Sequence, residues 1–162
     1  MAAWYYLWMS DRDVLLGLVR EYFALADGEL IQRHTETVVV CEIPADSVIH
    51  PHASAKMNIT RRALKHVVKS RRKELLKNHV TEVALDLILE AVSAVSEVIQ
   101  RFDFYELEAP DKHFYSKDFS ERGMPNVRIL LEQRDAELFI TSIHFQKRTK
   151  NTTCVVIFRS SE

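Results

Sequence analysis

Two groups of polar residues in this chain have types and spacings that suit phosphate chemistry. The first is the segment from Arg61 to Lys77, where eight of the 22 basic residues of the chain fall within seventeen positions. The formal net charge of the whole chain is only −1, so this positive charge is local and the remainder of the chain is acidic. Concentrated positive charge on one element is typical of anion binding, and a merely solvated helix face is the alternative.

The second group lies in residues 137–148, whose alternating pattern predicts a strand. A period of two places Ser142 and His144 on one face. It places Thr141 on the other face, with three large apolar residues, Phe139, Ile143 and Phe145. A hydroxyl and an imidazole side by side, followed by Lys147-Arg148, suit the binding and protonation of a phosphate. The alternative is an ordinary solvent-facing side of an antiparallel sheet.

The basic segment is expected to be a helix that Asn58 or Thr60 opens and that runs to about Leu76. On an ideal helical wheel, Arg71 falls in the middle of an apolar arc of about 140°. A guanidinium buried there needs an anion, so Arg71 is either a phosphate ligand or a member of a buried ion pair with a carboxylate. A distorted helix, in which Arg71 leaves the apolar arc, is the other alternative. His66 lies on the other side of the wheel, together with Arg62, Lys69 and Lys73. A lone surface histidine usually has no catalytic role.

The hydrophobic pattern along the chain predicts the elements that position these groups. Helical stripes are expected from about Ser10 to Ala26 and from Thr81 to about Arg101, with a strand over Glu36–Ile43 between them. Residues 45–57 are expected to form a loop. Alternation then predicts four strands, at residues 102–107, 127–132, 137–145 and 152–158, the last three forming an antiparallel meander.

This order of elements predicts the α+β class, with N-terminal helices packed on a C-terminal antiparallel β-meander of about four to five strands. Residues 1–30 are expected to form an N-terminal helical extension, and residues 36–162 the α+β domain, in one compact unit. Hydrophobic residues make up 47% of the chain, which suffices for the core of one domain.

Cysteines and glycines argue against several classes of site. Cys41 and Cys154 each lie among strand-like residues and are expected to be buried reduced thiols. His50 and His52 could bind zinc with His34 or Cys41, but no four-ligand spacing recurs, so no metal is expected. With three glycines in the chain, a phosphate-binding loop and a nucleotide cofactor are not expected.

The start of the chain is apolar for only about eight residues before Asp11. Such a stretch is shorter than a signal peptide or a membrane span requires. The expectation is a cytoplasmic protein without membrane contact.

The segment Ile59–Arg71, followed by a helix, a meander and the strand at 138–144, resembles the phage-associated nuclease domains of the barnase/EndoU/colicin/RelE-like (BECR) superfamily. Those domains are similar in having a helix with a leucine-lysine-histidine-apolar-apolar core and a second basic residue five positions after the histidine. The corresponding residues here are Leu64-Lys65-His66-Val67-Val68 and Arg71. The resemblance covers about residues 38–158. It implies metal-independent cleavage of RNA, in which a 2′-hydroxyl attacks the adjacent phosphate.

Carried over to this chain, the resemblance implies that His66 is the acid or base, Arg71 the phosphate stabiliser, and Thr141 or Ser142 a hydrogen-bonding partner. Strand alternation adds His144. The residues expected to bind the substrate are Arg62, Lys65, Lys69, Arg72, Lys147 and Arg148. The wheel separates His66 from Arg71 by about 140°, so both face one site only if the cleft wraps around the helix flank.

The sequence therefore predicts a small endoribonuclease, a hydrolase of toxin or phage effector type, with RNA as its partner and a protein inhibitor as a further one. The alternative is a non-catalytic module that binds nucleic acid or an acidic protein partner through the same basic helix. One cleft lined by His66, Arg71 and His144 would favour the nuclease. Separate surfaces would favour the binding module.

Overall fold

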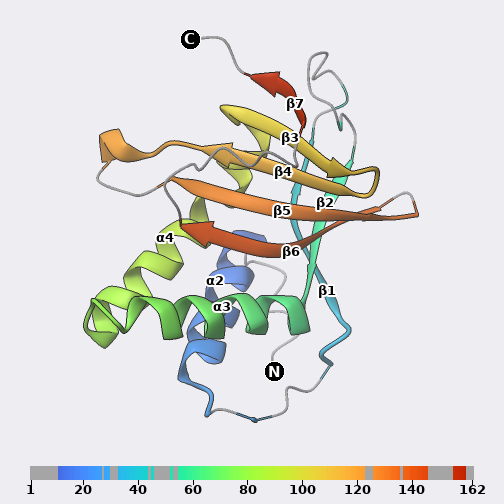
Figure 1. Ribbon diagram of the computed structural model, residues 1–162. Helices are drawn as coiled ribbons and strands as arrows, with labels where there is room; N and C mark the ends of the chain where they lie inside the picture. Colours follow the sequence, from blue (N-terminus) through green and yellow to red (C-terminus); the bar gives the residue numbers. More distant parts are fainter. Residues whose placement is uncertain are drawn as a thin grey trace.

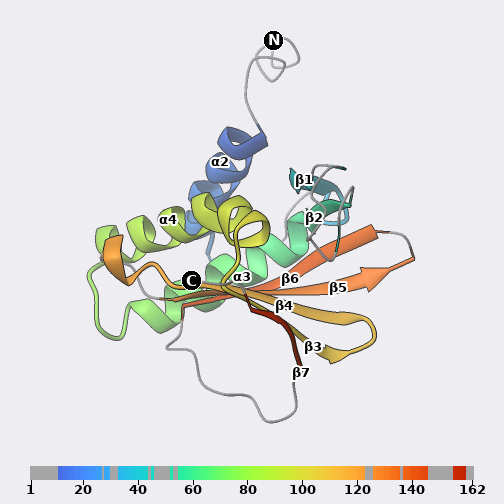
Figure 2. The same ribbon diagram turned by 90° about the horizontal axis from the view of Figure 1, so that it is seen from above.

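A computed structural model describes residues 11–26, 28–29, 33–43, 45, 52, 55–122, 126–135 and 137–145, and the backbone of 155–159. The helices in these ranges are α2 (Asp11–Ala24), α3 (Arg61–Leu75) and α4 (Thr81–Gln100), with a short 3-10 turn at Ser120–Arg122. The view from above shows α2 and α4 on one side of the sheet (Figure 2). This arrangement confirms the α+β class.

The sheet has seven strands in the described part of the chain. They are β1 (Thr37–Glu42), β2 (Lys56–Thr60), β3 (Phe104–Ala109), β4 (Lys112–Lys117), β5 (Val127–Arg134), β6 (Glu137–Phe145) and β7 (Val155–Arg159). Their order across the sheet is β1-β2-β6-β5-β4-β3-β7 (Figure 1). Only the β2–β6 pair is parallel, so the sheet is mixed rather than purely antiparallel.

Three expectations about the strands are wrong. The sheet exceeds four to five strands for two reasons. Strand β2 spans the end of the expected loop and the residues expected to open the basic helix, and β4 gave no alternating signal. Four consecutive residues of β4, from His113 to Ser116, are buried, so a period of two is not visible in its sequence. The last strand, β7, does not extend the meander beyond β6 but pairs with β3 at the opposite edge.

The three helices share one hydrophobic core with the sheet. Helix α4 contributes a broad apolar face, which comprises Ala84, Ile88, Ala91, Val92, Val95, Val98 and Ile99. The buried side of α2 belongs to the same core through Leu15, Leu18, Val19, Tyr22 and Phe23. Residues 11–24 of the expected N-terminal extension are therefore packed as part of the domain.

Helix α3 begins where β2 ends and lies along the edge of β6. Strand β2 pairs with β6 only at Met57 and Asn58, and the Asn58 side chain donates a hydrogen bond to the carbonyl of Leu138 at 3.3 Å. Thr60 then caps the helix, its Oγ1 accepting from the amide of Ala63 at 3.1 Å. The helix follows directly and packs against β6 (Figure 1).

A β-bulge decides which side chains of β6 share a face. Leu130 of β5 pairs with Ser142 but Leu131 pairs with Ile140, so Thr141 is an extra residue without a partner on β5. The bulge shifts the alternation by one position. Phe139 therefore lies on the same face as Ser142 and His144, opposite to the expectation from a regular strand. The burial pattern of β6 agrees with this assignment of faces, since its three fully buried residues are Leu138, Ile140 and Ile143.

Within the described residues, no helix combines the length and the apolar character that crossing a lipid bilayer requires.

Candidate active site

The face of β6 that carries Ser142 and His144 meets the side chain of Arg71 from α3. The Nη1 atom of Arg71 lies 3.0 Å from Nδ1 of His144, and the Oγ atom of Ser142 lies 2.7 Å from Nε2 of the same ring. A guanidinium can only donate, so Nδ1 of His144 is the acceptor and its ring proton is on Nε2. That proton is donated to Ser142. These contacts form one hydrogen-bonded chain, which we call the Arg71–His144–Ser142 chain.

The surroundings of His144 favour its neutral form. Burial lowers the pKa of His144, and the charges of Arg71 and Arg128 lower it further, while Glu74 acts in the opposite direction. A neutral imidazole at ordinary pH can accept a proton from a substrate hydroxyl. The lowered pKa thus agrees with the neutral ring that the hydrogen bonds require.

Arg71 is the expected buried cation. Its side chain is only 11% exposed, and it forms an ion pair of 3.1 Å with Glu74, one helical turn away. No acceptor among the described residues reaches its Nε atom, which is buried. The guanidinium is therefore compensated by a half-exposed carboxylate and a neutral ring, an arrangement that favours an additional anion beside it.

Two residues of this region escaped the sequence analysis. Arg128 is the register partner of His144 on β5, and its guanidinium carbon lies 4.0 Å from the ring centre of Phe114. Glu74 was counted only as a charge within the basic segment. The alternation of residues 127–131 could have indicated that Arg128 points away from the core, but only the register places it beside His144.

Thr141 and Ser142 have different surroundings. Ser142 is the hydroxyl that contacts His144, whereas the Oγ1 atom of Thr141 donates to the backbone carbonyl of Leu130 at 3.4 Å. The bulge turns Thr141 away from the chain of contacts. Of the two hydroxyls expected at this strand, the geometry thus brings Ser142 to His144.

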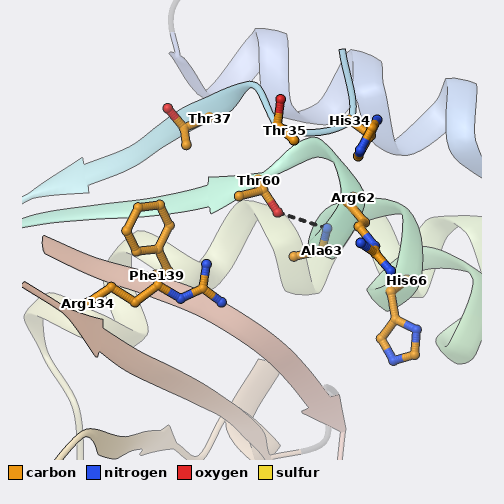
Figure 3. A pocket seen from close by; sticks show the side chains of 9 residues that line it. All are labelled: His34, Thr35, Thr37, Thr60, Arg62, Ala63, His66, Arg134 and Phe139. Atoms are coloured by element: carbon orange, nitrogen blue, oxygen red, sulfur yellow. Dashed lines mark hydrogen bonds between the residues drawn. The ribbon is translucent and has the colours of Figure 1, made fainter. Parts of the chain in front are cut away.

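His66 lies elsewhere, in an open cleft of about 650 Å³ near the start of α3 (Figure 3). We call this the Phe139 cleft. Its lining residues are His34, Thr35, Thr37, Thr60, Arg62, Ala63, His66, Arg134 and Phe139. The close-up shows Arg62 and His66 projecting from α3, with Arg134 and Phe139 on another side of the cleft and His34, Thr35 and Thr37 on a third. Arg71 and His144 do not line it, so the three expected catalytic groups do not share one cleft.

The basic residues expected to bind substrate also separate into two sets. Lys65 donates to the backbone carbonyl of Glu29, and Lys69 donates to that of Leu25, just beyond the end of α2. The guanidinium of Arg72 lies 5.1 Å from the ring centre of Phe23 on α2. These three cations therefore hold α2 against α3. Of the residues expected to bind substrate, Arg62 lines the Phe139 cleft, while Lys147 and Arg148 lie outside the described residues.

The residues considered for zinc are not gathered in the described part of the chain, where no group of three potential ligands occurs. His34 lines the Phe139 cleft, whereas Nδ1 of His52 lies 2.5 Å from the hydroxyl of Tyr115. Cys41 is a free thiol that is partly rather than fully buried, and its burial raises its pKa to about 11. His50 and Cys154 lie outside the described residues.

Comparison with known proteins finds no matching family model, no matching curated protein and no matching solved structure.

Proposed function

We propose that the protein is a metal-independent endoribonuclease that cleaves RNA through attack of a 2′-hydroxyl on the adjacent phosphate. The observation that carries this proposal is the Arg71–His144–Ser142 chain. It joins a buried cation, a neutral imidazole and a hydroxyl on one sheet face, from residues that are far apart in the sequence. Arg128 adds a second cation at the register partner of His144. A base and cations around the phosphate are among the groups that this reaction needs, together with a proton donor for the leaving 5′-oxygen.

The reaction would proceed as the guanidinium of Arg71 turns toward the phosphate and releases Nδ1 of His144. The 2′-oxygen then bonds to phosphorus while its proton passes to Nδ1. The bond from phosphorus to the 5′-oxygen breaks, and the leaving oxygen takes a proton from water, because His66 lies in a separate cleft. Ser142, oriented by His144, donates its hydroxyl to a phosphate oxygen. The products are a 2′,3′-cyclic phosphate and a 5′-hydroxyl.

The order of elements also supports the proposal. The basic helix α3 is followed by α4 and then by a meander of four strands, β3 to β6, whose last strand carries Ser142 and His144. This is the order on which the resemblance to BECR nuclease domains was drawn. His66 and Arg71, the two positions of the matched motif, both lie on the described helix.

The test is incubation of the protein with single-stranded RNA in the presence of EDTA. Wild type should cleave, and His144→Gln should cleave roughly 100-fold more slowly or worse because the base is lost. The matched control is His79→Gln, since His79 is an exposed histidine just beyond α3. No cleavage by wild type, or equal cleavage by His144→Gln, would contradict the proposal.

A non-catalytic module that binds nucleic acid is the second candidate. It is favoured by the position of His66 in a cleft that Arg71 and His144 do not line. It predicts binding that weakens steeply as salt increases and that survives His144→Gln, without cleavage. An absence of RNA binding in the same titration would contradict a nucleic-acid module and would favour an acidic protein as the partner instead.

A further inference from the structure

We infer that the Phe139 cleft binds one nucleotide of a single-stranded substrate, with the base stacked on Phe139 and its phosphate held by Arg62 and His66. The inference rests on the proposed function for the substrate class, RNA. It assigns to the cleft a recognition role that is separate from the chemistry at the Arg71–His144–Ser142 chain.

The side chains that line the cleft favour an anion. Two arginines and two histidines line it, and none of its lining residues is acidic. Arg62 is exposed, and no carboxylate among the described residues pairs with it. The neighbouring Arg61 differs, because it pairs with Glu36 at 3.2 Å. Arg62 is thus the cation of this pair that remains available to a ligand.

The backbone around the cleft is fixed before any ligand arrives. The amide of Arg62 donates to the carbonyl of His34, and the amide of Arg61 to that of Glu36, each at 2.9 Å. The amide of Ala63 donates to Thr60. The amides of the first turn of α3 are therefore engaged within the protein, so the side chains of Arg62 and His66 are the groups left to hold a phosphate. Because the backbone on this side of the cleft is already ordered, less conformational entropy is lost when a ligand binds.

Phe139 supplies a stacking surface at the side of the cleft. Its ring lies 5.1 Å from the guanidinium carbon of Arg134, a residue that also lines the cleft. The Arg134 side chain is 51% exposed, and its contact with Glu132 is a long 3.6 Å. It can therefore move aside or stack on the other face of a base. Aromatic rings and guanidinium planes are the usual partners of unpaired bases.

The position of the cleft connects it with the reaction site. Phe139 and Ser142 lie on the same face of β6, three residues and about 10 Å apart along the strand. A nucleotide in the cleft would therefore neighbour the one whose phosphate meets Arg71. The base must be unpaired, because a base inside a duplex is stacked on both faces and cannot reach Phe139.

A cleft of about 650 Å³ has the size of typical ligand sites.

The test uses a labelled 2′-O-methyl oligoribonucleotide, which lacks the attacking hydroxyl and therefore reports binding without cleavage. Phe139→Leu should weaken its affinity roughly 5- to 100-fold, as loss of one stacked base predicts, and Phe139→Trp should retain it. Phe104→Leu, a partly buried phenylalanine on the distant strand β3, is the matched control. Thermal unfolding of each variant shows whether its fold is intact.

A second pair of variants tests the phosphate contact. Arg62→Gln should weaken binding and reduce the slope of affinity against salt by about one ion, whereas Arg61→Gln should leave the slope unchanged. An unchanged slope in Arg62→Gln would overturn the assignment of the phosphate to this residue.

The outcomes separate the cleft from the proposed function. If wild type cleaves RNA while Phe139→Leu and Arg62→Gln bind and cleave as wild type does, the nuclease stands and the cleft assignment is overturned. If wild type cleaves nothing but binds the oligonucleotide in a manner that depends on Phe139, the assignment is supported and the nuclease fails. Equal affinity for a duplex overturns the stacking of an unpaired base.

Discussion

The two sides of α3 both carry lysine or arginine side chains, but these side chains have different contacts. On the side toward α2, Lys65 and Lys69 donate to backbone carbonyls near the end of that helix, and Arg72 covers Phe23. On the side toward β6, Arg71 contacts His144 on the open face of the sheet. Arg71 and Arg72 are adjacent in the sequence, yet Arg71 belongs to the candidate active site and Arg72 to a structural contact with α2.

The difference shows why a count of charges does not locate a site. Cations near the C-terminal end of a helix are stabilised by its unpaired carbonyls and by the negative end of its dipole. Such cations need no ligand. Arg71 has a neutral acceptor on one side and a half-exposed carboxylate on the other, so the described residues do not fully compensate its charge. The local partners of each cation, rather than their number, distinguish the two sides.

The largest expected effect separates these two neighbouring arginines. Arg71→Lys should lower the rate of RNA cleavage about 100-fold, because one ammonium cannot replace the forked donors that would hold the phosphate in the proposed reaction. Arg72→Lys, the matched change one residue away, should alter the rate less than about threefold. Initial rates on a labelled single-stranded RNA measure both. Equal rates for the two variants would remove the distinction between the sides of α3.

The next effect concerns stability. Lys65→Met and Lys69→Met should each lower the free energy of unfolding by about 1 kcal/mol, because each removes a charged hydrogen bond near the end of α2. Neither variant should change the rate of RNA cleavage.

Urea denaturation measures the loss, and Lys73→Met on the exposed side of α3 is the control. A stable Lys69→Met variant that has lost RNA binding would show that this lysine serves the ligand rather than α2.

The smallest effect is the contribution of His144 to the pH dependence of stability. Burial, Arg71 and Arg128 lower the pKa of His144 below its ordinary value of 6.5 in the folded protein. As pH falls below 6.5, the unfolded chain therefore takes up a proton that the folded chain resists, and the free energy of unfolding decreases.

His113 contributes in the same direction, since burial lowers its pKa, although Gln133 and Asp111 oppose the shift. His144→Gln should make the acid limb of a stability curve shallower than that of wild type. Chemical denaturation at pH values from about 7 to 5 measures the slopes. An identical slope in His144→Gln and wild type would show that His144 is not held neutral.

Much of the fold could be predicted because its signals are local. Thr60 caps α3 as one of the two residues expected there, and α4 begins at Thr81 and ends at Gln100, within one residue of the expected end. The hairpin between β5 and β6 forms at Arg134-Asp135, where Asp135 takes a positive φ of 55° that aspartate tolerates. Strand β4 could not be found, because burial on both of its faces removes the alternation.

The site was predictable only in part. The apolar arc of the helical wheel identified Arg71 as a buried cation, and alternation placed Ser142 beside His144. The pairing of Arg71 with His144 joins residues 73 positions apart, and no local pattern carries that information. Phe139 was predicted on the wrong face of β6. The bulged residue Thr141 shifts the alternation by one position, so the residues before it face the side opposite to that expected of a regular strand.

The sequence by itself determined the α+β class, the basic helix and the residue types that could bind phosphate, because capping and periodicity are properties of neighbouring residues. The tertiary structure alone decided which cations face α2 and which face the sheet. It also decided that His66 lies in the Phe139 cleft while Arg71 meets His144. The physical reason is that a helix presents its cations in all directions, and only the elements packed around it determine which of them are neutralised.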